Sequence, residues 1–130
     1  MSRKRENVRQ CKAIRQLIDD NKYTKALELI DAIPLEEVGS LDDLYRYAEL
    51  YEKAERMDKK KEIFYHIYHR THSRYMLNRL LRLTIRMGDM EEARELYFAY
   101  EVAGPITLDT FELRYLLAKA EGEPPERLIQ

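Results

Sequence analysis

The stretch Gly88 to Ala93 reads GDMEEA, and it separates two segments whose apolar residues recur at helical spacing. Glycine is favoured just past the end of a helix, because it adopts the left-handed backbone conformation without steric cost. Asp89 and Glu92, three residues apart, have the spacing of a pair that caps the start of the next helix. The stretch therefore predicts two helices joined by a very short turn.

Similar start and stop signals recur along the whole chain. Ser40 with Asp43 resembles a capping box, and Pro34 and Gly104–Pro105 are typical helix stops. The predicted helices begin at about Asn7, after Lys22, and at Ser40, Asp58, Ser73, Asp89 and Thr107, and a short eighth is expected over Glu126–Gln130. No segment alternates polar and apolar residues with a period of two. The fold class is expected to be all-α.

The breaks between paired helices recur at a nearly constant interval. They fall at Asn21, Met57–Asp58, Gly88 and Gly122, a spacing of about 34 residues, which is a period typical of helical-hairpin repeats. Such hairpins bury their apolar faces by stacking on one another.

The residues at these breaks resemble the tetratricopeptide-repeat family. GDMEEA is similar to that family's turn between its two helices, NKYTKA at Asn21 to Ala26 is similar to a second copy, and Phe111 stands where the family has a large aromatic residue. The resemblance implies a right-handed solenoid of antiparallel helical hairpins, about three and a half repeats long. The hairpins are expected at about residues 7–34, 40–72, 73–105 and 107–130, in one domain over residues 1–130. Because the last hairpin is incomplete, the chain is expected to be a fragment of a longer protein.

Composition and charge narrow the classes of function. The net charge is −1, but successive blocks carry +5 (residues 1–16), −7 (17–58), +7 (59–88) and −6 (89–130). Cys11 is the one cysteine, so no intramolecular disulfide is possible, and no apolar run has the length of a membrane span. A cytoplasmic protein without membrane contact is expected.

All three histidines lie in the stretch YHIYHRTH at residues 65–72. His66, His69 and His72 stand at three-residue intervals, so the outer two diverge around a helix and cannot reach one ion together. We interpret them as a ring-rich flank of a helix, with His72 in the turn before Ser73. The sequence also has no phosphate-binding glycine loop, nucleophile elbow or metal-binding cysteine pattern. No enzymatic activity, metal or other cofactor is predicted.

A polar stripe on the fifth predicted helix is the main candidate binding site. Asn78, Arg82 and Arg86 stand at i, i+4 and i+8, opposite the apolar positions of that helix. By resemblance the first helix of each hairpin lines a concave groove, and the matching positions on the other first helices are Arg15, Tyr45, Glu49 and Glu112. The predicted function is a protein-interaction scaffold that holds a peptide or helical segment in this groove. A second interpretation is that the arginines only pair with the acidic blocks beside them.

Nucleic acid and a second copy of the chain are two further candidate partners. Basic residues interleaved with tyrosines also suggest a helical repeat that binds nucleic acid, although acidic blocks flank the basic one and would repel a phosphate backbone. Leu128 and Ile129 begin an apolar face with nothing after it, so self-association through the C-terminal end is a further expectation.

Overall fold

The computed structural model describes residues 3–122, with side chains described from Arg5 onward. These residues form seven α-helices and one short 3₁₀ turn, and they contain no strand. The elements are α1 (Arg3–Asp19), α2 (Tyr23–Ala32), η1 (Leu35–Glu37), α3 (Leu41–Lys53), α4 (Met57–Thr71), α5 (Arg74–Met87), α6 (Met90–Val102) and α7 (Leu108–Ala120). The all-α prediction is confirmed. The expected helix over Glu126–Gln130, with Leu128 and Ile129, lies outside the described residues.

The chain divides into two compact units, and the boundary falls inside α4, between Ile67 and Tyr68. The first unit holds α1 to α3 and the larger part of α4, and the second holds α5 to α7.

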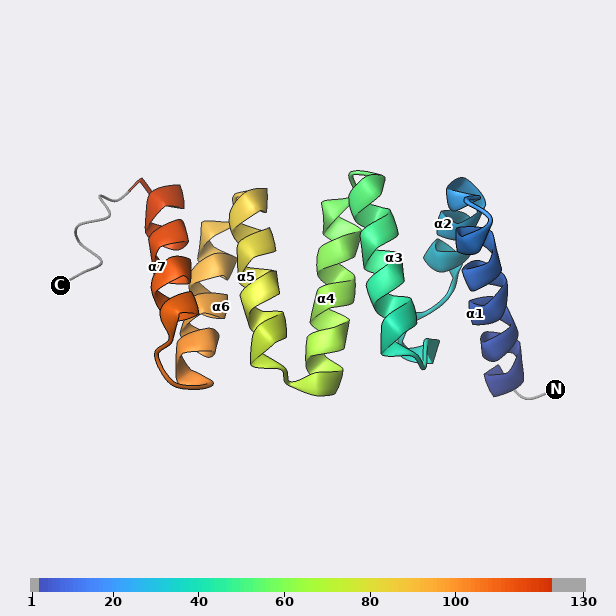
Figure 1. Cartoon of the computed structure of the whole chain (residues 1–130), viewed down its shortest axis with the longest axis horizontal. Helices are drawn as coiled ribbons and strands as arrows, with labels where there is room; N and C mark the ends of the chain where they lie inside the picture. The colour runs from blue at the N-terminus through green and yellow to red at the C-terminus, as the bar shows by residue number, and fades with distance from the viewer. Residues whose placement is uncertain (1–2, 123–130) are drawn as a thin grey trace. The chain divides into compact units, whose positions relative to one another are not determined.

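In the first unit α1 and α2 pack against each other as an antiparallel pair, and α2 also packs against α3 (Figure 1). Fully buried side chains from these helices, from α4 and from the segment after η1 form the core: Ile14, Ala26, Val38, Leu44, Tyr47 and Ile63. Polar contacts tie the exposed edges of the core together. The Tyr51 hydroxyl and Arg56 both contact Asp31, and Lys60 pairs with Glu52 at 2.9 Å.

In the second unit α5, α6 and α7 each pack against the other two. The core combines Met76 and Tyr100 with small and branched apolar residues, among them Leu77, Leu80, Leu81, Ala93, Leu96 and Leu113. Arg74 lies 4.0 Å above the ring of Tyr100 and donates from Nε to the Tyr100 carbonyl at 3.0 Å, so α5 supports the last turn of α6. Phe111, expected in a large-aromatic position, is 54% exposed on α7.

The predicted helix starts at Ser40, Ser73 and Asp89 are confirmed. Each of these side chains accepts a hydrogen bond from the backbone N–H three residues later, at 3.2 to 3.3 Å. The cap predicted at Asp58 is wrong, because α4 begins at Met57 and Asp58 lies in its first turn.

A left-handed residue follows each of the odd-numbered helices. Asn21, Glu55, Gly88 and Gly122 have φ of 59°, 59°, 82° and 81°, and they follow α1, α3, α5 and α7 at intervals of 34, 33 and 34 residues. At Glu55 the left-handed residue lets the Arg56 N–H bond to the Tyr51 carbonyl, so the chain reverses at once and α4 starts earlier than predicted. His72, with φ of 52°, forms the expected turn before Ser73.

These conformations predict opposite effects of substitution at two equivalent turns. Gly88→Ala should lower the free energy of unfolding by about 1 kcal/mol, because a Cβ in the left-handed conformation clashes with its own backbone. For the same reason Glu55→Gly should raise it by up to about 1 kcal/mol. Equilibrium urea unfolding, followed by circular dichroism, measures both.

Gly39→Ala is the matched control, because an added Cβ meets nothing within 4 Å at either Gly39 or Gly88. Only Gly88 of the two has a positive φ. Equal losses of stability in Gly39→Ala and Gly88→Ala would contradict the conformational explanation.

Candidate binding pocket

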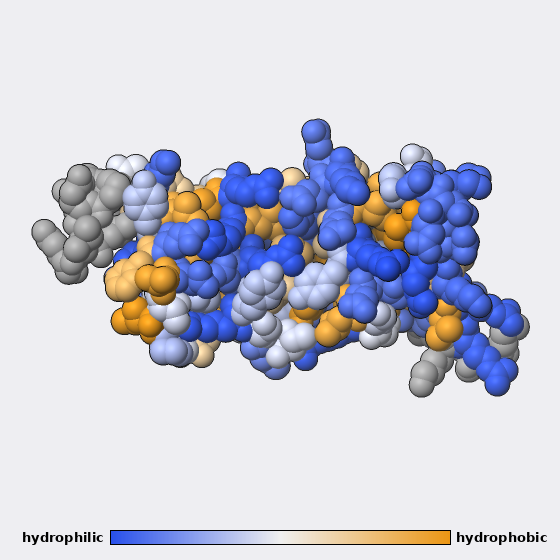
Figure 2. All heavy atoms as spheres, viewed as in Figure 1, coloured by the Kyte–Doolittle hydropathy of each residue, from blue (hydrophilic) through white to orange (hydrophobic). Residues whose placement is uncertain are grey.

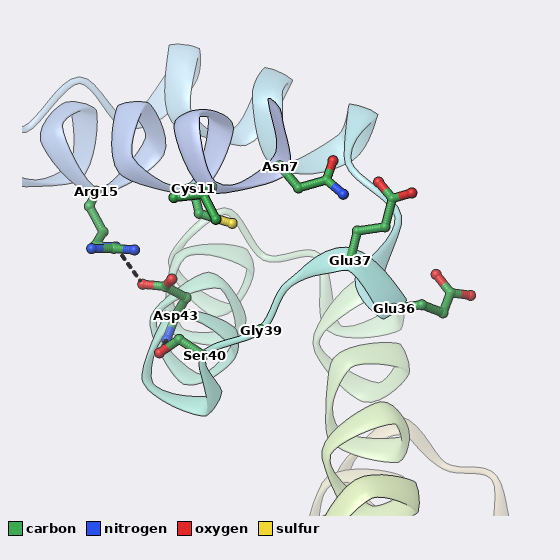
Figure 3. Close-up of a pocket in the computed structure, with 9 residues that line it drawn as sticks. Asn7, Cys11, Arg15, Glu36, Glu37, Gly39, Ser40 and Asp43 are labelled. Atoms are coloured by element: carbon green, nitrogen blue, oxygen red, sulfur yellow. Dashed lines mark hydrogen bonds and ion pairs between the residues drawn. The ribbon is translucent and has the colours of Figure 1, made fainter. Parts of the chain in front are cut away.

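A pocket of about 430 Å³ lies in the first unit, between α1 and the segment from η1 to the start of α3 (Figure 3). Its lining combines apolar, acidic and basic side chains: Asn7, Val8, Cys11, Arg15, Glu36, Glu37, Gly39, Ser40 and Asp43. Most of the lining surface is apolar, and the cavity opens to solvent. This combination is typical of sites that bind part of a ligand by apolar contact and orient it with few polar groups.

Local sequence rules position both walls of the pocket. On α1, Asn7, Cys11 and Arg15 stand at i, i+4 and i+8, so they share one face of the helix. Opposite them, Pro34 ends α2 and begins η1, and Ser40 caps α3. The first turn of α3 therefore brings Asp43 under the face of α1.

The Asp43 carboxylate is the central polar group of the pocket. The residue is only 3% exposed, and its Oδ1 lies 3.0 Å from Arg15 Nε. Its Oδ2 is buried and has no hydrogen-bond partner. Figure 3 shows this carboxylate pointing from α3 toward α1.

The expected capping box at Ser40 is therefore only half formed. The Ser40 hydroxyl accepts from the Asp43 backbone N–H at 3.3 Å, but the Asp43 side chain turns to Arg15. Aspartate is one methylene shorter than the glutamate that usually completes this box, so the tertiary ion pair replaces the local bond.

A second buried polar group lies beside Asp43. Tyr47 is fully buried on α3, and its hydroxyl forms no well-directed hydrogen bond. Burial raises the pKa of Tyr47 above its ordinary value of 10, and the neighbouring Cys11 thiol and Asp43 carboxylate add to the effect. Tyr47 and Cys11 therefore form a neutral layer beneath the ion pair, which limits the solvent that reaches it.

The predicted groove residues of the first unit separate into two groups. Arg15 lines the pocket and pairs with Asp43. Tyr45 is half-buried and Glu49 is exposed on α3, and the pocket lining includes neither.

In the second unit three predicted residues lie together. Arg82 donates from Nε to Asn78 Oδ1 at 2.6 Å and from Nη1 to Glu112 at 3.0 Å, so α5 is tied to α7. Arg86, the last residue of the stripe, is exposed. The guanidinium of Arg82 thus pairs with an acidic neighbour, as the second interpretation of the stripe expected.

A smaller pocket of about 290 Å³ also lies in the second unit, lined by Arg74, Tyr75, Asn78, Tyr100, Thr107 and Asp109. Its basic lining residue, Arg74, is held by the ring and carbonyl of Tyr100. Gly104 leaves the room that this arginine needs, because a Cβ there would lie 2.7 Å from Arg74 Nη1. The structure therefore uses Arg74 to hold two helices together.

The histidines are dispersed around the end of α4. His66 is half-buried within the helix and His69 is exposed, while His72 follows the helix in a turn. Residues 3–122 contain no group of three or more His, Cys, Asp and Glu side chains placed to hold a metal ion. Over the same residues, no helix combines the length and apolar character that crossing a membrane requires.

Comparison of the chain with protein-family models, with curated proteins and with solved structures finds no match in any of the three.

Sequence reasoning missed the acidic side of the pocket. Nothing in the sequence distinguishes Glu36, Glu37 and Asp43 from the capping and solvated carboxylates that are common near helix ends. A usable signal was present on α1, because Asn7, Cys11 and Arg15 repeat the spacing of Asn78, Arg82 and Arg86.

The two ion pairs between α1 and α3 provide a matched test of Asp43 burial. Arg15→Ala removes the partner of a buried carboxylate and should lower the free energy of unfolding by about 1–3 kcal/mol. Arg46→Ala breaks the pair with Asp19, which spans 3.9 Å between exposed side chains, and should cost less than about 0.5 kcal/mol. Urea unfolding of both variants measures the difference, and equal costs would show that Asp43 is not effectively desolvated.

Proposed function

We propose that this chain is a non-catalytic protein-interaction module that binds a peptide or helical segment of a partner along its odd-numbered helices. The observation that carries the proposal is the pocket of the first unit, which combines an apolar wall with a buried carboxylate oxygen that lacks a partner. A segment of another protein supplies both an apolar contact and a hydrogen-bond donor. The single cysteine supports a cytoplasmic location.

We also propose the repeat architecture that the sequence resemblance implies, a tetratricopeptide-like solenoid of helical hairpins. Its support is the recurrence of left-handed residues at 21, 55, 88 and 122, each following an odd-numbered helix. In such a fold the odd-numbered helices would line one concave surface. The pocket residues of α1 and α3, and the Asn78–Arg82–Glu112 cluster of α5 and α7, all lie on odd-numbered helices.

Photocrosslinking tests the binding surface with two tyrosines of the first unit. A benzophenone amino acid replaces Tyr45 on α3, or Tyr23 on α2 as the matched control, and each protein is irradiated in lysate of the source cells. A covalent protein adduct is expected at position 45 and not at 23, because the even-numbered helix lies outside the proposed surface. Mass spectrometry identifies the adduct.

Nuclease treatment before irradiation separates the proposal from its alternative, a helical repeat that binds nucleic acid. An adduct at position 45 that survives nuclease supports protein binding. An adduct lost after nuclease favours nucleic acid, and adducts confined to position 23 contradict the proposed surface.

Self-association is a second proposal, carried by an apolar stripe on α7. Leu108, Phe111 and Tyr115 stand at i, i+3 and i+7 and are 87%, 54% and 42% exposed. Figure 2 shows apolar side chains gathered at the α6–α7 end of the second unit. An exposed apolar stripe of this kind marks an interaction surface.

The charges of α7 favour a second copy of this chain as the occupant. Exposed Asp109 lies at the start of the helix and exposed Lys119 at its end. Two copies of α7 packed antiparallel across a two-fold axis would therefore align the acidic start of each helix with the basic end of the other.

Sedimentation equilibrium of matched aromatic variants tests this dimer. Phe111→Ser should weaken self-association at least about tenfold, because it removes the centre of the apolar stripe. Tyr75→Ser on α5 is the control, since Tyr75 is 64% exposed and, like Phe111, has an arginine of its own helix over its ring. A wild type that stays monomeric, or equal weakening by both variants, contradicts the proposal.

A further inference from the structure

The pocket between α1 and α3 has a specific electrostatic requirement, which its lining residues define. Asp43 is 3% exposed, and its Oδ2 accepts no hydrogen bond although a carboxylate oxygen has two lone pairs. A buried polar atom left in this state is unfavourable, and the same carboxylate gains most from a charged donor.

The charge of the lining favours a cation. Three carboxylates, those of Asp43, Glu36 and Glu37, line the pocket with one basic side chain, that of Arg15, and the remaining polar lining residues, Asn7 and Ser40, are neutral. Glu36 and Glu37 also interact with other groups of the chain. Glu36 is exposed and Glu37 half-buried, so both lie nearer the mouth than Asp43 does. The unpartnered oxygen of Asp43 at the base therefore favours a positive group there.

The walls favour a cation carried on an alkyl stem. Val8 is 59% exposed on α1, and Cys11 lies one turn further along the same helix with 5% exposure. These two side chains form an apolar strip that leads from solvent toward Asp43. A long basic side chain buries its methylene groups on such a strip while its charged end reaches a polar group.

The geometry favours an ammonium over a guanidinium. Arginine binds a carboxylate best through two parallel hydrogen bonds, which need both oxygens. Here Asp43 Oδ1 is already 3.0 Å from Arg15 Nε, so only Oδ2 lacks a hydrogen-bond partner. The compact ammonium of lysine needs one acceptor at a time.

We propose that this pocket receives a lysine side chain of the partner segment, with the alkyl stem on Val8 and Cys11 and the ammonium donating to Asp43 Oδ2. The inference rests on the proposed function, because it assigns the partner's anchoring residue. It predicts a partner segment that is basic at the point where it meets α1 and α3.

Amide-resolved NMR titration of the full chain tests the assignment with defined peptides. The probe is acetyl-Ala-Lys-Ala-amide, and its matched controls contain norleucine, which has a similar stem without the charge, or arginine. We expect saturable shifts of the Gly39, Ser40 and Asp43 amides with the lysine peptide. The norleucine peptide should bind at least about tenfold more weakly, and the arginine peptide several-fold more weakly.

Two variants connect the shifts to the carboxylates. Asp43→Asn keeps the shape of the side chain and should abolish saturable shifts, whereas Glu37→Gln at the mouth should weaken the lysine peptide about two- to threefold. If Asp43→Asn does not fold, the Glu36→Gln, Glu37→Gln double variant replaces it, because both positions lie outside the core. The double variant should weaken binding further than Glu37→Gln alone.

Equal binding of the lysine and norleucine peptides, or no saturable shift of pocket amides, would overturn the cation site. Equal or tighter binding of the arginine peptide would overturn the choice of lysine. If the lysine peptide does not bind but an adduct forms at position 45, the proposed function stands and only the lysine site is rejected. Saturable binding of the lysine peptide without an adduct at position 45 would support the lysine site and contradict the proposed function.

Discussion

The abrupt reversal of the chain after each odd-numbered helix is the constraint on which the rest of the structure depends. At 21, 55, 88 and 122 a single residue in the left-handed conformation ends the helix and turns the backbone. Only two of the four are glycine, so Asn21 and Glu55 adopt this conformation at a steric cost that helix packing must offset. The near-constant interval repeats the pattern of a helix, a tight turn and a second helix along the chain.

The reversals also place the polar residues. Arg15 precedes the first left-handed residue by the same distance as Arg82 precedes Gly88, and each reaches a carboxylate on the next odd-numbered helix of its own unit. The two ion pairs differ in how deeply their carboxylates are buried. Glu112 is an exposed acceptor for Arg82, whereas Asp43 is buried beside Cys11 and Tyr47 with one oxygen left open. Equivalent arginines thus make a surface contact in one unit and the side of a pocket in the other.

Local rules predicted what local physics controls. The caps at Ser40, Ser73 and Asp89 and the glycine end of α5 follow from hydrogen bonding and backbone sterics within a few residues. The start of α4 was predicted too late, at Asp58, because the turn before it depends on Glu55. Nothing in the sequence indicates that this glutamate adopts the left-handed conformation usual for glycine. The sequence did not indicate that Phe111 is exposed, because α7 is apolar on more than one face and its pattern does not show which face is buried.

The sequence by itself determined the helices, the short turns between them and the stripes of polar residues, because hydrophobic periodicity and capping act over a few residues. It also identified Asn78 and Arg82 as part of a polar stripe, and the family resemblance added Arg15 and Glu112 as groove positions. The tertiary structure alone decided which of these residues are paired with one another and which carboxylate is buried. Those outcomes depend on side chains from helices far apart in the chain, and desolvation at such a contact is set by packing that no local pattern encodes.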